Sequence, residues 1–357
     1  MSQISTSYRE PHFTLQWHIT ARCDNRCSHC YIYNSDSLAS EIDNELKLEE
    51  CLRVIDDFVE TFQHWKMPCR INFTGGDPLL RPDLFELIKY ACNKDIVIGI
   101  MGNSNHLDME KACHLKDLGV YRYQVSIDGI EETHDSIRGK GNFRDTIRAL
   151  QILNEARIPS IVMFTLSKQN ADNLIDIINL VAENDVSIFD FARLVPIGNA
   201  MKLKDQILSA QEYRNLLLRV LEKYKNLQDN GCRTYFGRKD HLWNLLYKEL
   251  GLWKSLPQQD KKTIYSGCGI GSSILTILAD GTVYPCRRLP VKIGKVPEQS
   301  IRDIFIESSK LNKMRQVENM EKCSKCELMQ FCRGCMAVAY AVHGDYMAPD
   351  PQCWKKI

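Results

Sequence analysis

The sequence has little that would direct the chain to a membrane, out of the cell or onto a nucleic acid. Its 357 residues include 46 basic and 45 acidic side chains, a balance that argues against a general nucleic-acid binder. No apolar run reaches the length of a membrane span, and the first residues, MSQISTSYREPHF, lack the pattern of a signal peptide. We therefore expect a soluble, cytoplasmic protein with no nucleic-acid or membrane partner.

Cysteine is the residue type that the sequence has in excess. There are 15 cysteines, and nothing in the sequence directs export to a compartment where disulfides form. An odd number also fits poorly with complete pairing. In a reducing cytosol, clustered cysteines more often bind metal or take part in chemistry.

The first 200 residues alternate between strand and helix patterns. Repeated units of this kind predict a parallel sheet covered by helices, so the fold class is α/β, with a partial (β/α)6 TIM-like barrel. Active sites of such barrels lie at the C-terminal ends of the strands. The expected strands are 13–20, 69–74, 96–101, 121–127, 159–166 and 187–194, and the expected helices are 46–64, 82–93, 107–118, 142–157 and 171–184.

Composition divides the chain into three expected parts. The barrel occupies 1–205, and a helical bridge with helices at 208–228 and 238–255 occupies 206–265. Residues 266–357 are expected to form a C-terminal cysteine-rich domain, which contains seven cysteines and a hairpin signal with Asp280-Gly281 at the turn. The family resemblance given below implies that it is an iron–sulfur domain.

A first cysteine cluster directly follows the first expected strand. Cys23, Cys27 and Cys30 form a C-x3-C-x2-C run, and three thiolates can hold three irons of a [4Fe–4S] cluster. The fourth iron then stays open for a cofactor or substrate. A structural zinc site, which is the alternative, takes four protein ligands. The position at the top of a barrel strand favours the cluster.

This run resembles the signature of the radical SAM superfamily, whose members use S-adenosylmethionine (SAM). Supporting motifs follow in order: TGGDP at 74–78 is similar to the family's GGEP with Asp in place of Glu, and SIDG at 126–129, HDSIRG at 134–139 and RLVP at 193–196 come after it. The resemblance covers about residues 12–200. It implies SAM contacts by His29, Gly75, Gly76, Asp77, Ser126, Arg138 and Leu194.

The resemblance also implies an activity. A reduced cluster cleaves SAM to methionine and a 5′-deoxyadenosyl radical, which takes a hydrogen atom from the substrate, and a flavodoxin or ferredoxin supplies the electron. A protein that only transfers electrons or binds zinc is the non-enzyme alternative.

The C-terminal cysteines resemble those of the SPASM domain, which holds two auxiliary [4Fe–4S] clusters and brings the expected total to three. The run ends C-x2-C (CRGC), whereas the family usually has C-x3-C, and a zinc-binding tail is the alternative, although zinc ribbons separate such pairs by about 15–20 residues. The resemblance implies an outer cluster on Cys323, Cys326, Cys332 and Cys353, and an inner cluster on Cys268, Cys286 and Cys335. The fourth position of the inner cluster is open to substrate or filled by an unidentified residue.

Five cysteines remain outside these sets: Cys51, Cys69, Cys92, Cys113 and Cys232. Free cysteines commonly behave as small buried hydrophobic residues. We expect the three that fall in predicted helices, Cys51, Cys92 and Cys113, to lie in the core.

The substrate is the least determined feature. Members with a SPASM domain mostly modify ribosomally made peptides, so the resemblance favours an oxidative, cross-linking peptide maturase, with a small-molecule enzyme for a sugar or tetrapyrrole as the alternative. Only 22 residues precede Cys23, so we expect the barrel, the bridge or a separate leader-binding protein to hold the peptide. Arg287 follows Cys286 where sulfatase-maturing members place an aspartate base. Arg287 and Arg288 suit a carboxylate or acidic peptide, with solvated surface arginines as the alternative.

Overall fold

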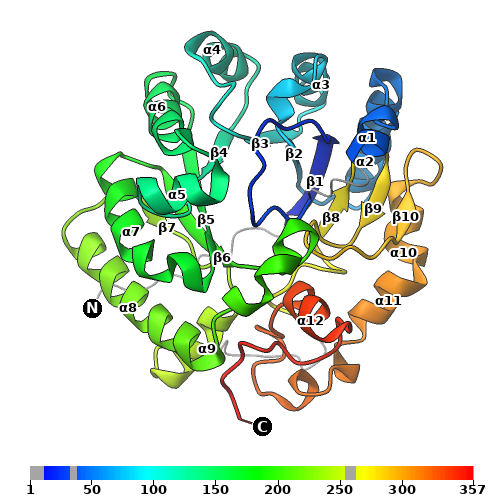
Figure 1. The fold of residues 1–357 in the computed structure, drawn as a ribbon. Coiled ribbons are helices and arrows are strands. Elements are labelled where there is room, and N and C mark those ends of the chain that lie inside the picture. Colours follow the sequence, from blue (N-terminus) through cyan, green and yellow to red (C-terminus); the bar gives the residue numbers. More distant parts are fainter. Residues whose placement is uncertain (1–11, 33–37, 254–262, 357) are drawn as a thin grey trace.

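The computed structural model describes residues 12–32, 38–253 and 263–356. Within them, ten strands form one sheet in the order β10-β9-β8-β1-β2-β3-β4-β5-β6-β7. Figure 1 shows the parallel strands in the centre and the helices outside them. The predicted α/β class and partial (β/α)6 barrel are confirmed, because β1 to β6 pair in sequence order and all in parallel.

The barrel strands and their helices lie within a few residues of the predicted bounds. The strands are β1 Phe13–Thr20, β2 Cys69–Gly75, β3 Val97–Met101, β4 Arg122–Ser126, β5 Ser160–Leu166 and β6 Ile188–Arg193. The helices are α1 Leu38–Asp43, α2 Leu48–His64, α3 Leu84–Cys92, α4 Met109–Asp117, α5 Glu131–Arg138, α6 Asn142–Glu155 and α7 Leu174–Glu183, with 3-10 turns at Pro78–Leu80, Lys168–Asn173 and Gly198–Gln206. Sequence periodicity missed α1 and α5, which are the shortest of these helices, with six and eight residues.

The first strand is buried on both faces, as a central strand of a parallel sheet should be. One face is apolar: Phe13 packs on Phe62 of α2 with ring centroids 4.2 Å apart, and Trp17 packs on Phe73 of β2. The alternate residues, among them Gln16 and His18, point to the opposite face, which lines the barrel interior.

The bridge and the C-terminal part both extend the barrel sheet. β7 Tyr235–Phe236 lies between α8 Ala210–Asp229 and α9 Leu242–Glu249 and pairs in parallel with β6. On the other edge, β8 Ile274–Ile277 pairs in parallel with β1, followed by β9 Thr282–Tyr284 and β10 Gly294–Lys295. The predicted hairpin is confirmed, and its turn residue Gly281 has a φ of +84°, which glycine adopts without strain. The remaining elements are α10 Ile301–Glu307, α11 Ser309–Arg315, α12 Met336–His343 and the 3-10 turns Val317–Asn319 and Cys323–Lys325.

A buried ionic cluster joins the three parts of the chain. Arg193, at the end of β6, lies 2.6 Å from Asp240 of the bridge and 2.8 Å from Asp350 near the C-terminus. The backbone amide of Cys335 also donates to Asp350 at 2.8 Å. The cluster therefore positions one of the C-terminal cysteines relative to the barrel.

The prediction for the helical cysteines holds only in part. Cys51 is fully buried in α2, and Cys92 is partly buried and packs against the core. Cys113 is exposed, so its placement in the core was wrong. The reason is helix geometry: α4 buries Ala112 and Leu115, and a residue between them in sequence points away from that face.

None of the described helices combines the length and the apolar character that crossing a membrane requires.

Candidate active site and iron–sulfur centres

A cavity at the C-terminal ends of the barrel strands brings the predicted site residues together. All three cysteines of the first cluster line it. So do six of the seven residues expected to contact SAM, namely His29, Gly75, Gly76, Ser126, Arg138 and Leu194. These residues come from three different strand ends, helix α5 and the cysteine loop, so the sheet rather than the local sequence assembles the site.

The Gly75-Gly76 segment packs directly against the chain that leads to the cysteines. A Cβ atom on Gly76 would lie 2.0 Å from the carbonyl oxygen of Arg22, a distance that no side chain tolerates. The backbone amide of Gly76 donates to the carbonyl of Thr20 at 2.8 Å, and that of Asp77 donates to Arg22 at 2.7 Å. The glycines thus allow the end of β2 to hold the start of the cysteine loop.

Asp77 has a different position from the other predicted SAM contacts. Its side chain is fully buried and accepts a hydrogen bond from the amide of Leu79 at 3.2 Å, at the start of the Pro78–Leu80 turn. Burial raises the pKa of Asp77. The carboxylate lies outside the set of described residues that line the cavity, so we infer that it shapes the TGGDP turn.

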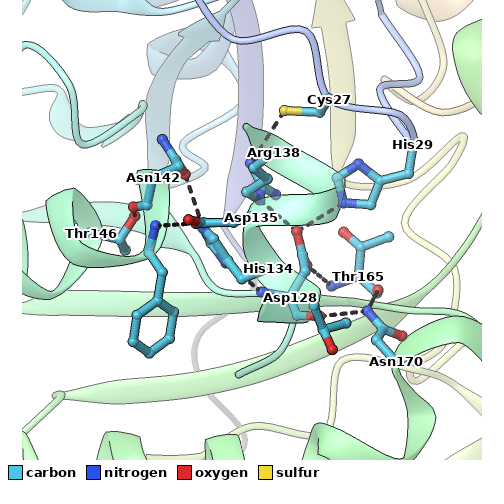
Figure 2. Close-up of polar contacts among 12 residues, drawn as sticks. Cys27, His29, Asp128, His134, Asp135, Arg138, Asn142, Thr146, Thr165 and Asn170 are labelled. Atoms are coloured by element: carbon cyan, nitrogen blue, oxygen red, sulfur yellow. Dashed lines mark hydrogen bonds and ion pairs between the residues drawn. The ribbon is translucent and has the colours of Figure 1, made fainter. Parts of the chain in front are cut away.

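Asp128 organises two of the predicted SAM contacts, and the sequence analysis gave it no role. Its carboxylate lies 2.8 Å from Nε2 of His29 and accepts from Nε of Arg138 at 2.5 Å, and its other oxygen accepts from the amide of Thr165 at 2.7 Å (Figure 2). Burial opposes ionisation, but Arg138 and His29 outweigh it and lower the pKa of Asp128 below its usual range. An acidic residue just past a barrel strand was a usable signal.

A second layer holds Asp128 in place. The amide of Asp128 donates to Nδ1 of His134 at 3.1 Å, so the His134 proton resides on Nε2, which donates to Asn142 at 2.9 Å (Figure 2). Nδ2 of Asn170 donates to the Asp128 carbonyl at 2.8 Å. The HDSIRG segment forms the C-terminal half of helix α5 and the glycine that follows it, and it presents Arg138 to the cavity and His134 to Asp128.

The Asp128→Asn substitution tests this arrangement. It leaves the Arg138 guanidinium buried without its carboxylate, and hydrogen bonds to charged groups contribute about 1.5–3 kcal/mol. We expect the dissociation constant for SAM to rise by about 10- to 100-fold. Equilibrium dialysis of the anaerobically reconstituted protein measures it. Asp135→Asn, on the same helix, is the control, because Asp135 accepts from the backbone amides of Gly141 and Phe143. Equal affinity of both variants would contradict a positioning role.

The donor set at the cavity fits an iron–sulfur cluster. Cys27 is buried, and burial raises the pKa of its thiol to about 11, an effect that the nearby Arg138 guanidinium opposes. Nη1 of Arg138 lies 3.8 Å from the Cys27 sulfur, and Nδ2 of Asn103 donates to Cys23 at 3.2 Å. Donors to sulfur stabilise the thiolate form that ligates iron.

The C-terminal cysteines separate into the two predicted sets. A second cavity is lined by Cys323, Cys326, Cys332 and Cys353, the four residues proposed to hold the outer cluster. The remaining three are neighbours elsewhere: burial, together with charge repulsion from Cys335 and Cys286, raises the pKa of Cys268 to about 12.

The CRGC spacing, which is one residue shorter than the family's usual C-x3-C, is accommodated by an unusual turn. Arg333 and Gly334, between Cys332 and Cys335, have φ values of +85° and +63°. This left-handed turn sends Cys332 to the second cavity and Cys335 toward Cys268. Within the described ranges, no three Cys, His, Asp or Glu side chains converge on one metal ion. A cluster needs no such convergence, because each thiolate binds its own iron.

Arg287 and Arg288 are half-buried and line the central cavity rather than the outer surface. The Arg287 guanidinium is 5.6 Å from the ring centre of Tyr31, and Nη1 of Arg288 donates to the Arg193 carbonyl at 3.3 Å. Neither forms an ion pair with a carboxylate of the described chain.

Comparisons with known proteins agree with the fold and the site. Residues 17–181 match the model of the radical SAM superfamily, and residues 268–336 match an iron–sulfur cluster-binding domain, SPASM. The chain is 30% identical to an AdoMet-dependent heme synthase of Methanosarcina barkeri over 342 residues, which are 95% of both chains. It therefore belongs to the radical SAM superfamily. More particularly, it is a radical SAM enzyme with a C-terminal SPASM domain.

Other relatives have different names. An Fe-coproporphyrin III synthase, also of M. barkeri, is 31% identical over 353 residues, 95% of this chain and 86% of that protein. The mycofactocin maturase MftC of Mycolicibacterium smegmatis is 27% identical over 95% of this chain and 82% of its own. The solved structure of Streptococcus suis SuiB bound to its precursor peptide SuiA superposes with a TM-score of 0.74 over 97% of this chain and 76% of that one, at 18% identity, a likeness of fold.

Proposed function

We propose that this radical SAM enzyme oxidatively modifies a substrate that carries carboxylates, with a tetrapyrrole as the first candidate. The observation that carries this proposal is Arg287, a cation in the central cavity that has no carboxylate partner in the described chain. A half-buried guanidinium is stabilised by an anion that reaches it, and its planar fork matches a carboxylate.

Lys239 adds a second cation near Arg287. Its side chain is exposed to solvent and is not among the described residues that line the central cavity. The surrounding protein, together with Arg287 and Arg288, lowers the pKa of Lys239, and the nearby Asp190 opposes this shift. An anionic ligand bound here would relieve the repulsion among these three cations.

The relatives support a tetrapyrrole ahead of a peptide. The two with tetrapyrrole names are 30% and 31% identical over 95% of this chain, whereas MftC is 27% identical. The predicted peptide maturase stays a second candidate, favoured by MftC and by the fold shared with peptide-bound SuiB.

The chain's residues have distinct proposed roles. Bound to Cys23, Cys27 and Cys30, a reduced cluster would supply the electron that cleaves SAM and yields the hydrogen-abstracting radical. His29 and Arg138, oriented by Asp128, position SAM, and Arg287 positions the substrate. The two sets of C-terminal cysteines would hold auxiliary clusters, of which the inner one is suited to accept the electron that the oxidised substrate loses.

The test compares two substrates with the anaerobically reconstituted, reduced enzyme. With SAM and Fe-coproporphyrin III we expect 5′-deoxyadenosine to form and the porphyrin mass to change, and Arg287→Gln should raise KM for the porphyrin by about tenfold or more. Arg233→Gln, at an exposed ion pair, is the control. An unchanged porphyrin, with hydrogens lost in pairs from a co-expressed peptide encoded beside the enzyme, would overturn the proposal in favour of the peptide.

A further inference from the structure

His18 is a buried histidine with no hydrogen-bond partner on either ring nitrogen. Only 3% of the residue is exposed, and both Nδ1 and Nε2 are buried without a partner. It lies on the interior face of β1, opposite Thr74 of β2, and its ring contacts that of Tyr31 at a centroid distance of 6.3 Å. Thr74 and Tyr31 both line the central cavity, and His18 adjoins them without being one of the lining residues itself.

The polar atoms without partners continue along the same face. Gln16 is paired in register with Thr276 of β8, and Oε1 of Gln16 and Oγ1 of Thr276 are also buried without partners. Leaving a buried polar group unsatisfied costs about 1–3 kcal/mol, and native proteins rarely leave several together. Such a group of atoms is typical of a site that a ligand or ordered water completes.

Charge indicates which ligand group belongs beside His18. Burial and the Arg287 guanidinium lower the pKa of His18 to about 3, so the imidazole is neutral at pH 7 and keeps one N–H donor. A neutral donor within the electrostatic reach of a guanidinium that has no carboxylate partner suits a carboxylate, which accepts from both.

We propose that His18 donates a hydrogen bond to the substrate carboxylate that Arg287 holds, forming with Thr74 and Tyr31 the inner wall of a carboxylate subsite. The proposal rests on the proposed function only in assuming a carboxylate on the substrate. It assigns His18 to binding and gives it no part in proton transfer.

Two probes separate the subsite from the identity of the substrate. The first is propionate, with neutral propionamide as its matched control, added to the reconstituted protein. A ligand that binds the folded state raises the midpoint of thermal unfolding. We expect propionate, but not propionamide, to raise the midpoint of the wild type and of His18→Gln, which keeps a donor, and not that of His18→Phe.

The second probe is Fe-coproporphyrin III, titrated by its visible absorbance. We expect His18→Phe to weaken binding by about tenfold, and to have no effect on binding of the methyl ester, which lacks the carboxylates. His114→Gln, at a histidine stacked on Phe85 outside the site, controls for loss of a histidine.

The outcomes decide separately between the two proposals. If propionate stabilises His18→Phe as much as the wild type, or fails to stabilise the wild type, the subsite is wrong. If the propionate result holds and the porphyrin does not bind, the subsite stands and the tetrapyrrole proposal fails.

Discussion

Replacing Cys23, Cys27 and Cys30 together with alanine should abolish 5′-deoxyadenosine formation and remove about four irons per chain, while the auxiliary clusters remain. The three thiols line the cavity with the predicted SAM contacts, and among the residues that the structure describes no other cysteine lines it. Iron analysis and chromatography of the reaction products measure the two effects. Cys113→Ala is the matched control, because this cysteine is exposed on α4 and outside all three sets.

The auxiliary cysteines extend the same experiment. Although Cys332 and Cys335 are three residues apart, we expect Cys332→Ala to disturb only the outer cluster and Cys335→Ala only the inner one. Mössbauer or electron paramagnetic resonance spectra of the two variants should then differ. Identical spectra would contradict the separation of the two sets, and retained SAM cleavage in the triple variant would contradict the assignment of the first cluster.

Replacing Arg193 with methionine should destabilise the protein by about 3–5 kcal/mol, because it leaves two buried carboxylates without their cation. Both partners, Asp240 and Asp350, are themselves almost fully buried, and Asp350 also accepts from Cys335. The effect should appear in chemical denaturation of the reconstituted protein, with loss of iron from the inner set. Arg233→Met breaks an exposed ion pair and should change stability by no more than about 1 kcal/mol.

A rescue variant distinguishes charge imbalance from lost packing. Adding Asp240→Asn and Asp350→Asn to Arg193→Met removes the unpaired charges and should restore a substantial part of the lost stability. If Arg193→Met behaves like Arg233→Met, the cluster does not hold the three parts of the chain together.

Local sequence patterns determined much of the barrel and of the metal chemistry. Buried strands such as FTLQWHIT and amphipathic helices such as α2 carry their own periodicity, so six strands and their main helices were predictable. Several thiolates close together in sequence usually bind metal. The C-x3-C-x2-C run therefore indicated the first iron–sulfur cluster without a structure. The residues expected at the cavity, Asp77 excepted, do line it.

Only the tertiary structure decided how distant segments meet. Strand pairing depends on backbone hydrogen bonds that no local pattern specifies, so the joining of β8 to β1 and of β7 to β6 could not be foreseen. The position of Asp128 past a strand was a signal in the sequence, but its partners were not, because His29 lies 99 residues earlier in the chain.

Burial is likewise a property of the folded chain. The sequence around Arg287 is equally compatible with a side chain in solvent and with one in a cavity. Cys113 and Cys51 both fall in helices, and only the packing of those helices shows that one is exposed and the other buried. Electrostatic interactions strengthen as water is excluded. How strongly Arg287 and His18 can bind a ligand therefore depends on where the fold places them. The sequence by itself determined the elements and the kind of cofactor chemistry, and the packing of β1, β8 and the C-terminal cysteines decided which side chains face the substrate.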